Sequence, residues 1–160
     1  MIGISIYKQA AVQFCIQQFD LKQKKSSFLQ SGFYFPNPYL YHGVISGYPV
    51  AISWSESRFK VFIQTKGKDY SNEEYHRATI QLQLAGAIMS TYYTENKCYV
   101  SDSEGEYLTH RNDASLLVLH YFPSVHDSVS VLKDRIMQVI NWANQEGLES
   151  VTHKLAYWLE

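Results

Sequence analysis

Apolar residues recur at helical spacing in the first twenty positions of the chain. The apolar positions that fall on one side of a helix are Ile4, Tyr7, Ala11, Phe14, Cys15 and Phe19. A polar run over residues 23–27 ends this periodicity. The pattern predicts an amphipathic first helix with one face against a core.

From Leu40 the pattern changes to one typical of β-strands. We expect strands over residues 40–46, 48–55 and 58–65, with Val50, Ile52 and Trp54 on one face of the second and Phe59, Val61 and Ile63 on one face of the third. Ser46-Gly47 and residues 55–57 have turn-forming side chains, which predicts consecutive hairpins. Before these strands, Pro36 and Pro38 each remove a backbone donor, so residues 33–39 are expected to form an extended connector or an edge.

A capping-box pattern, Ser71 followed by Glu74, marks the start of a middle helix that we expect to run to about Glu95. One apolar stripe on this helix comprises Tyr75, Ala78, Leu82, Ala85, Met89 and Tyr92. Ile80, Leu84, Ala87 and Ile88 fall on the opposite side. A helix that is apolar on two faces is expected to be covered on two faces, either by the C-terminal helices or by a second copy of the chain.

The second half of the sequence predicts three more strands, over residues 98–102, 106–111 and 114–121. The last is apolar on both faces, which favours a position inside the sheet. A helix is then expected from Ser124 to a stop at Gly147, with a core stripe of Val125, Val129, Leu132, Ile136, Val139, Ile140 and Ala143. The tail from Val151 resembles a short docking helix, although its alternation also fits a strand.

Together these elements predict one α+β domain over residues 1–160. Its order is α-βββ-α-βββ-α-α, with an antiparallel sheet of about six strands and helices packed on it, because every link between strands is too short for a crossover helix. The length fits a single hydrophobic core.

Composition places the chain among globular proteins, with 46% hydrophobic and 18% charged residues. The first twenty residues lack the features of a secretory signal, and no apolar run approaches the ~18 residues of a membrane span. Cys15 and Cys98 are far apart, and no Asn-x-Ser/Thr acceptor occurs. We therefore expect a cytoplasmic protein, outside the membrane, with both cysteines reduced.

The search for catalytic and metal-binding motifs favours a non-catalytic protein without cofactor or metal. There is no P-loop, dinucleotide fingerprint, nucleophile elbow or zinc-protease motif. The histidines at 42, 76, 110, 120, 126 and 153 show no metal-ligand spacing. A nucleophilic pair of Cys98 with a histidine stays open, since such partners meet only in space. The acidic turn over residues 102–106 is interpreted as a solvated hairpin tip rather than a cation site.

The strongest candidate for a binding surface is the segment from Lys22 to Tyr41. Lysines at 22, 24 and 25 precede several rings, and we assign partner binding to Phe33, Tyr34, Phe35, Tyr39 and Tyr41. Basic side chains beside rings suit a peptide groove or single-stranded nucleic acid. Residues 1–68 carry net charge +6 and residues 69–160 carry −7, yet the pI near 6.6 disfavours nucleic acid as a partner.

The order of elements over residues 4–146 resembles the type III secretion chaperone-like fold. The matching features are an amphipathic first helix, three strands, a middle helix, more strands and a long C-terminal helix. Members of that family are small cytoplasmic proteins, commonly homodimers, that hold partner polypeptides in extended form. The resemblance implies a chaperone-like or adaptor domain that binds another polypeptide. It also favours a homodimer, whose interface we assign to the second apolar face of the middle helix, formed by Ile80, Leu84, Ala87 and Ile88.

Two alternative functions from other classes remain open at this point. One is a single-stranded nucleic-acid binder that uses the Lys22–Tyr41 segment. The other is a small enzyme or ligand-binding domain with a cavity lined by Tyr and His.

Overall fold

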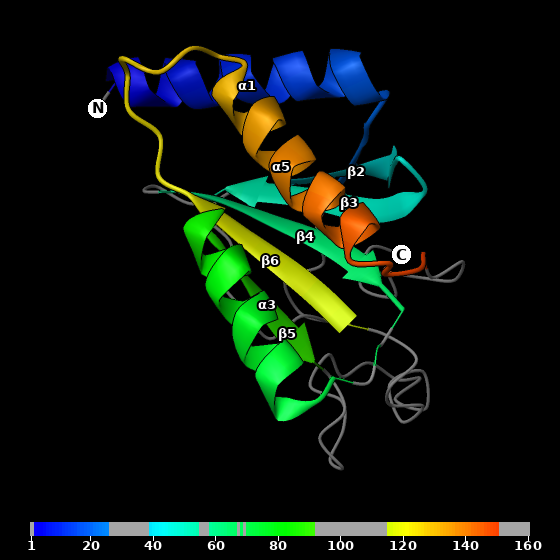
Figure 1. Ribbon diagram of the computed structural model, residues 1–160. Helices are drawn as coiled ribbons and strands as arrows, with labels where there is room; N and C mark the ends of the chain where they lie inside the picture. The colour runs from blue at the N-terminus through cyan, green and yellow to red at the C-terminus, as the bar shows by residue number, and fades with distance from the viewer. Residues whose placement is uncertain are drawn as a thin grey trace.

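The computed structural model describes residues 2–25, 39–54, 58–66, 68, 70–91 and 115–150. These residues form α1 (Ile2–Phe19), β1 (Lys22–Lys25), β2 (Tyr39–Ile45), β3 (Tyr48–Trp54), β4 (Phe59–Thr65), α3 (Asn72–Leu84), β5 (Ala87–Thr91), β6 (Ser115–Tyr121) and α5 (Val131–Gln145). The strands make one antiparallel sheet in the order β1-β2-β3-β4-β6-β5 (Figure 1). The predicted α+β fold, an antiparallel sheet of six strands with helices packed on it, is confirmed.

The hairpin between β2 and β3 follows from its turn residues. Ser46 and Gly47 both have positive φ, 52° and 88°, and they lie between the paired residues Ile45 and Tyr48. Two successive residues with positive φ give a turn whose twist matches that of the flanking strands. The turn predicted from Ser46-Gly47 therefore fixes the register of the two strands.

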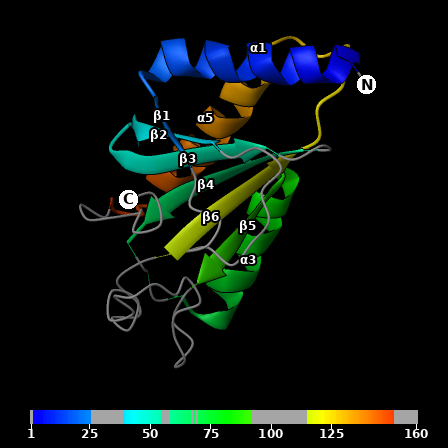
Figure 2. The ribbon, with the colours of Figure 1, turned by 180° about the vertical axis from the view of Figure 1, so that it is seen from behind.

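The main core lies on one face of the sheet. The side chains that point to this face from the central strands include Val50, Ile52, Phe59, Val61, Ile63, Leu117 and Leu119, all fully buried. α1, α3 and α5 supply the opposing layer through residues such as Ala11, Leu82 and Ile136. Figures 1 and 2, seen from opposite sides, show α3 and α5 on the same side of the sheet. The described helices thus all cover one face.

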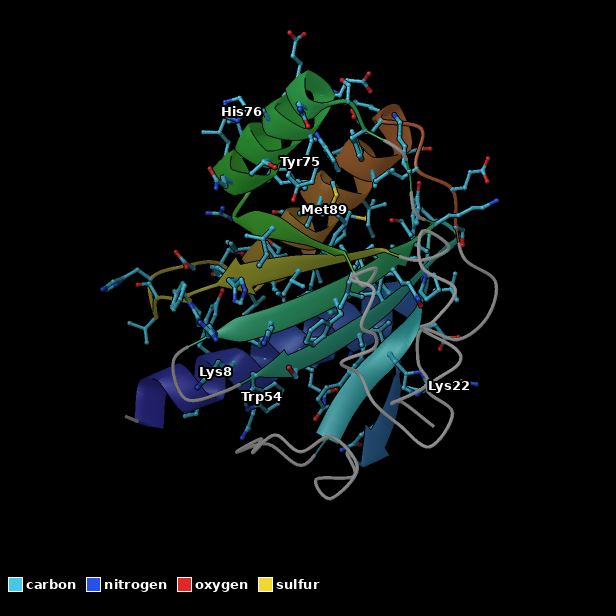
Figure 3. The ribbon with its side chains drawn as sticks, turned by 90° about the horizontal axis from the view of Figure 1, so that it is seen from below. Lys8, Lys22, Trp54, Tyr75, His76 and Met89 are labelled. Atoms are coloured by element: carbon cyan, nitrogen blue, oxygen red, sulfur yellow. The ribbon has the colours of Figure 1, made fainter. Side chains whose placement is uncertain are left out.

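The other face of the sheet is also apolar at its centre. Ala51, Phe62, Leu116 and Val118 point away from the helices and are buried. Figure 3 looks onto this face, with α1 and α5 behind the sheet. β6 lies between β4 and β5, which confirms that the strand ending at Tyr121 is inside the sheet.

The middle helix is shorter than its sequence periodicity predicts. It begins at the predicted cap, where Glu74 N donates to Ser71 Oγ at 3.2 Å, but it ends at Leu84 instead of about Glu95. Gly86 has a φ of 81°, and its carbonyl accepts a hydrogen bond from His120 N at 3.0 Å. Pairing with β6 therefore replaces helix continuation, and residues 87–91 form β5.

The last helix begins later than predicted, at Val131 rather than near Ser124. Asp127 Oδ2 accepts hydrogen bonds from Ser124 N and the Tyr121 hydroxyl, which holds residues 124–127 in a turn. Val125 and Val129 are consequently exposed, outside the core stripe that continues from Leu132. The predicted stop at Gly147 is confirmed by its φ of 78°.

In the described part of the chain four strands precede α3, because the lysine-rich residues after α1 form β1, which was not predicted from the sequence. The sequence of β1 lacks the alternation of apolar and polar residues that is typical of a strand, but its backbone pairs with β2 from Lys22↔His42 to Lys25↔Tyr39. The strands predicted over 98–102 and 106–111 and the tail after Val151 lie outside the described residues.

Candidate functional site

Helix α3 buries little apolar surface against the sheet. Within the helix only Ala78 and Leu82 are buried, although Ala85 continues the same stripe into the following turn. Tyr75, predicted on this stripe, is partly exposed and packs edge-on against Tyr70. The helix therefore depends on further contacts for its position.

A polar cluster between α3 and α5 provides those contacts. The Arg77 guanidinium makes a bidentate pair with Glu146, at 2.7 and 3.2 Å, and also donates to Gln81 Oε1 at 3.0 Å. Trp142 Nε1 donates to the same Gln81 oxygen at 2.7 Å. The hydrogen bonds from Arg77 hold the pKa of Glu146 below its usual value despite partial burial. This cluster fixes α3 relative to α5 on the solvent side.

The outward side of α3 carries large apolar side chains in water. Ile80 is 44% exposed and Leu84 is 80% exposed, one helical turn apart. Ile88, just beyond the helix on β5, is 48% exposed. Scattered apolar residues are normal on a protein surface, but these three belong to two consecutive elements at one end of the sheet.

β5 forms that end of the sheet. Among the described residues it pairs with β6 alone, from Ala87↔Leu119 to Thr91↔Ser115, so its other side has no strand partner there. We call this backbone edge, together with Ile80, Leu84 and Ile88, the β5 edge surface. Figure 3 labels Tyr75 and His76 on α3 and Met89 on β5, which locate this end of the molecule.

The four residues predicted to share a dimer interface do not lie on one helix face. Ile80 and Leu84 are on α3, whereas Ala87 and Ile88 are on β5 and point to opposite faces of the sheet. Ala87 is 1% exposed and belongs to the core, so its assignment to an exposed interface is wrong. The reason is the end of α3 at Leu84, which replaces helical spacing by strand alternation.

The aromatic residues predicted to bind a partner are only partly described. Phe33, Tyr34, Phe35 and the side chain of Tyr39 lie outside the described part. Tyr41 is 7% exposed and its ring stacks on Trp54, with centroids 5.6 Å apart. Tyr41 is therefore a core residue and not an exposed anchor. Trp54, labelled in Figure 3, in turn meets the Phe59 ring edge-on.

Cys15 lacks the properties of a reactive thiol. It is a free cysteine buried between α1 and the core, and burial raises the pKa of its thiol to about 12. Cys98, His110, His153 and the acidic turn over residues 102–106 lie outside the described residues. His76 and His126 are exposed.

Within the described ranges, no group of three or more His, Cys, Asp or Glu side chains is placed to hold a metal ion. No helix of that part has the length and apolar character to cross a membrane. Comparison with family models, curated proteins and solved structures gave no match.

Proposed function

We propose that this chain is a non-catalytic interaction domain that binds another polypeptide at the β5 edge surface. The observation that carries the proposal is the exposure of Leu84. This side chain is 80% exposed and lies beside β5, whose outer edge pairs with no other strand of the described residues. A polypeptide that adds a strand to an open edge gains main-chain hydrogen bonds, and apolar side chains beside that edge supply anchoring area.

The composition of β5 supports this use of its edge. Ala-Ile-Met-Ser-Thr contains no charge and no proline. Proteins commonly place lysine, proline or a bulge on an edge strand to prevent pairing with other chains. β1, at the opposite edge of the sheet, has this protection in Lys22, Lys24 and Lys25. The two edges differ, and β5 is the one suited to pairing.

The resemblance to the type III secretion chaperone-like fold also supports the proposal, because its members hold polypeptides in extended form. An extended chain is the conformation that an open strand edge accepts. On this proposal the protein acts in the cytoplasm as an adaptor or chaperone-like domain. A second copy of the chain is the other occupant to be tested, through Ile80 and Leu84.

A photo-crosslinking residue at position 84, introduced in the host cell, tests the proposal directly. We expect crosslinks to a defined polypeptide, which is then purified for titration against the protein. Leu84→Asp should weaken its binding by about tenfold or more, since apolar anchors at interface centres contribute about 2 kcal/mol or more. The matched control is Gln83→Asp, an exposed neighbour that gains the same charge and should leave affinity within about twofold.

Light scattering distinguishes the two occupants. A mass of two chains that falls to one in Leu84→Asp, but not in Gln83→Asp, identifies a second copy as the partner. Equal affinity and equal mass for both variants would contradict the proposal.

A further inference from the structure

The six described strands carry basic residues but no acidic residue. Several of the basic side chains belong to the sheet face opposite the helices. Lys22 and His42 are paired on β1 and β2, and Lys60 and His120 are paired on β4 and β6. This face therefore carries two pairs of basic residues. The pair of Lys60 and His120 is the more buried, because both are partly buried whereas Lys22 is exposed.

Lys60 and His120 lie directly opposite each other in the ladder between β4 and β6. Their side chains point to the same face, because directly paired residues of antiparallel strands share a face. Neighbouring strands are about 4.8 Å apart, so an ammonium and an imidazole in this register can contact oxygens of one small ligand. Ser53 occupies the next place in the same row, on β3.

Within the described part of the chain, neither nitrogen has its usual polar or charged partner. His120 Nδ1 is buried and has no hydrogen-bond partner among the residues that the structure describes. Lys60 Nζ lies 5.5 Å from the centroid of the Phe62 ring, and no described carboxylate is within ion-pair distance of it. A polar atom that is removed from water without a partner is destabilising, so an anion that reaches the imidazole would relieve an unfavourable state.

Arg58 increases the positive potential around this pair. It acts electrostatically on both Lys60 and His120, and its Cζ lies 5.9 Å from the centroid of the Phe122 ring. Arg58 also interacts with another group, so the two side chains assigned to the ligand are Lys60 and His120. Burial, together with these neighbouring charges, lowers the pKa of both Lys60 and His120.

We propose that Lys60 and His120 bind a small phosphate-type oxyanion on the sheet face opposite the helices. The Lys60 ammonium supplies a point charge, and protonated His120 donates from Nδ1, which gives that nitrogen its missing partner. An anion also offsets the repulsion among Arg58, Lys60 and His120. This site is distinct from the β5 edge surface and is tested independently of it.

Binding is expected to be linked to protonation of His120. The charged neighbours that act on it in the described structure are Arg58 and Lys60, both from the β4 side; on the β5 side it faces Gly86, which has no side chain. A bound anion favours the charged imidazole, so phosphate should raise the pKa of His120. Affinity for phosphate should therefore increase as pH falls through the pKa of His120.

The experiment is a pH titration of the His120 imidazole by NMR, with inorganic phosphate or chloride at equal ionic strength. We expect the pKa of His120 to be higher in phosphate by about one unit, equivalent to about tenfold tighter binding to the protonated form. Lys60→Gln should remove the difference, and Lys60→Arg should retain it. Lys66→Gln, which deletes an exposed lysine paired with Glu149, is the matched charge control.

An unchanged pKa of His120 in phosphate would overturn the proposal, as would an equal loss of the effect in Lys60→Gln and Lys66→Gln. If Lys60→Gln fails to fold, calorimetric titration of phosphate into His120→Asn replaces it, and retained binding there refutes the site. A single-stranded oligonucleotide that binds through Lys60 when inorganic phosphate does not would also refute a small-anion site.

Discussion

The hydroxyl oxygens of Tyr7 on α1 and Tyr121 on β6 are 2.9 Å apart inside the protein. Tyr121 gives its single proton to Asp127 Oδ2 at 2.6 Å, because a carboxylate is the strongest acceptor in reach. The Tyr7 proton is then shared between the Tyr121 oxygen and the Ser128 carbonyl, at 2.8 Å. One short chain of hydrogen bonds thus joins the first helix, strand β6 and the turn before α5.

Tyr121→Phe should lower the free energy of unfolding by about 1–3 kcal/mol, because it deprives both Asp127 and Tyr7 of a partner while preserving the ring. Urea denaturation followed by circular dichroism measures the change. Tyr75→Phe removes a hydroxyl from a half-exposed ring and should alter stability by less than about 0.5 kcal/mol. Equal effects of the two substitutions would show that the network contributes nothing.

Stability should fall in acid through Glu146. Its folded pKa is depressed, chiefly by the hydrogen bonds from Arg77, so the unfolded chain binds the proton more readily. The contribution is complete above the unfolded value of about 4.3 and disappears as pH falls through the folded value. We expect the free energy of unfolding, measured by denaturation from neutral to acidic pH, to decrease less below about pH 4.3 in Arg77→Gln than in the parent protein. Parallel curves would contradict the assignment.

The fold was largely predictable because its elements depend on local patterns. Three of these patterns involve only residues close together in the sequence: the alternation in β3 and β4, the Ser46-Gly47 turn and the Ser71 cap. Gly86 shows the limit of such reasoning: residues 87–91 continue a helical apolar pattern, but pairing with β6, whose register no local signal specifies, makes them a strand. β1 was missed for a similar reason, since Lys-Gln-Lys-Lys has low strand propensity and is ordered by pairing with β2.

Two leucines on one helix should respond very differently to truncation. Leu82→Ala removes a fully buried side chain and should cost about 2–5 kcal/mol. Leu84→Ala, two residues further along, should change stability by no more than about 0.5 kcal/mol in the monomer. The two midpoints of chemical denaturation, measured at the same low concentration, test this. A large cost at Leu84 would mean that another chain already covers it.

The Cys15 thiol should stay protected from modification in the folded protein. With its pKa at about 12 and no exposure, it presents almost no thiolate at pH 8. In a Cys98→Ser background, an aromatic disulfide reagent should label Cys15 only at the rate of opening of the structure, and immediately in denaturant. Fast labelling of native protein would disprove a closed environment for α1. That Cys98 is also reduced stays a prediction.

The candidate sites were less predictable than the fold. Ile80 and Leu84 were predicted from their helical spacing to be covered, either by the C-terminal helices or by a second copy. Both are exposed, so α5 does not cover them, and cover by a second copy stays a prediction. Tyr41 was misassigned because aromatic content does not distinguish a core stack from a binding surface. Lys60 and His120 are sixty residues apart, and only the pairing of β4 with β6 brings them together. No spacing rule identifies such a pair.

The position of Tyr7 has a consequence for synthesis on the ribosome. Its hydroxyl partners, Tyr121 and the carbonyl of Ser128, follow it by 114 and 121 residues, and α1 packs chiefly on α5, near the other end of the described chain. α1 is therefore synthesised well before the residues on which it chiefly packs. Until those later residues are synthesised, the apolar side of α1 lacks its cover from α5, and such exposed apolar surface favours contacts with other chains.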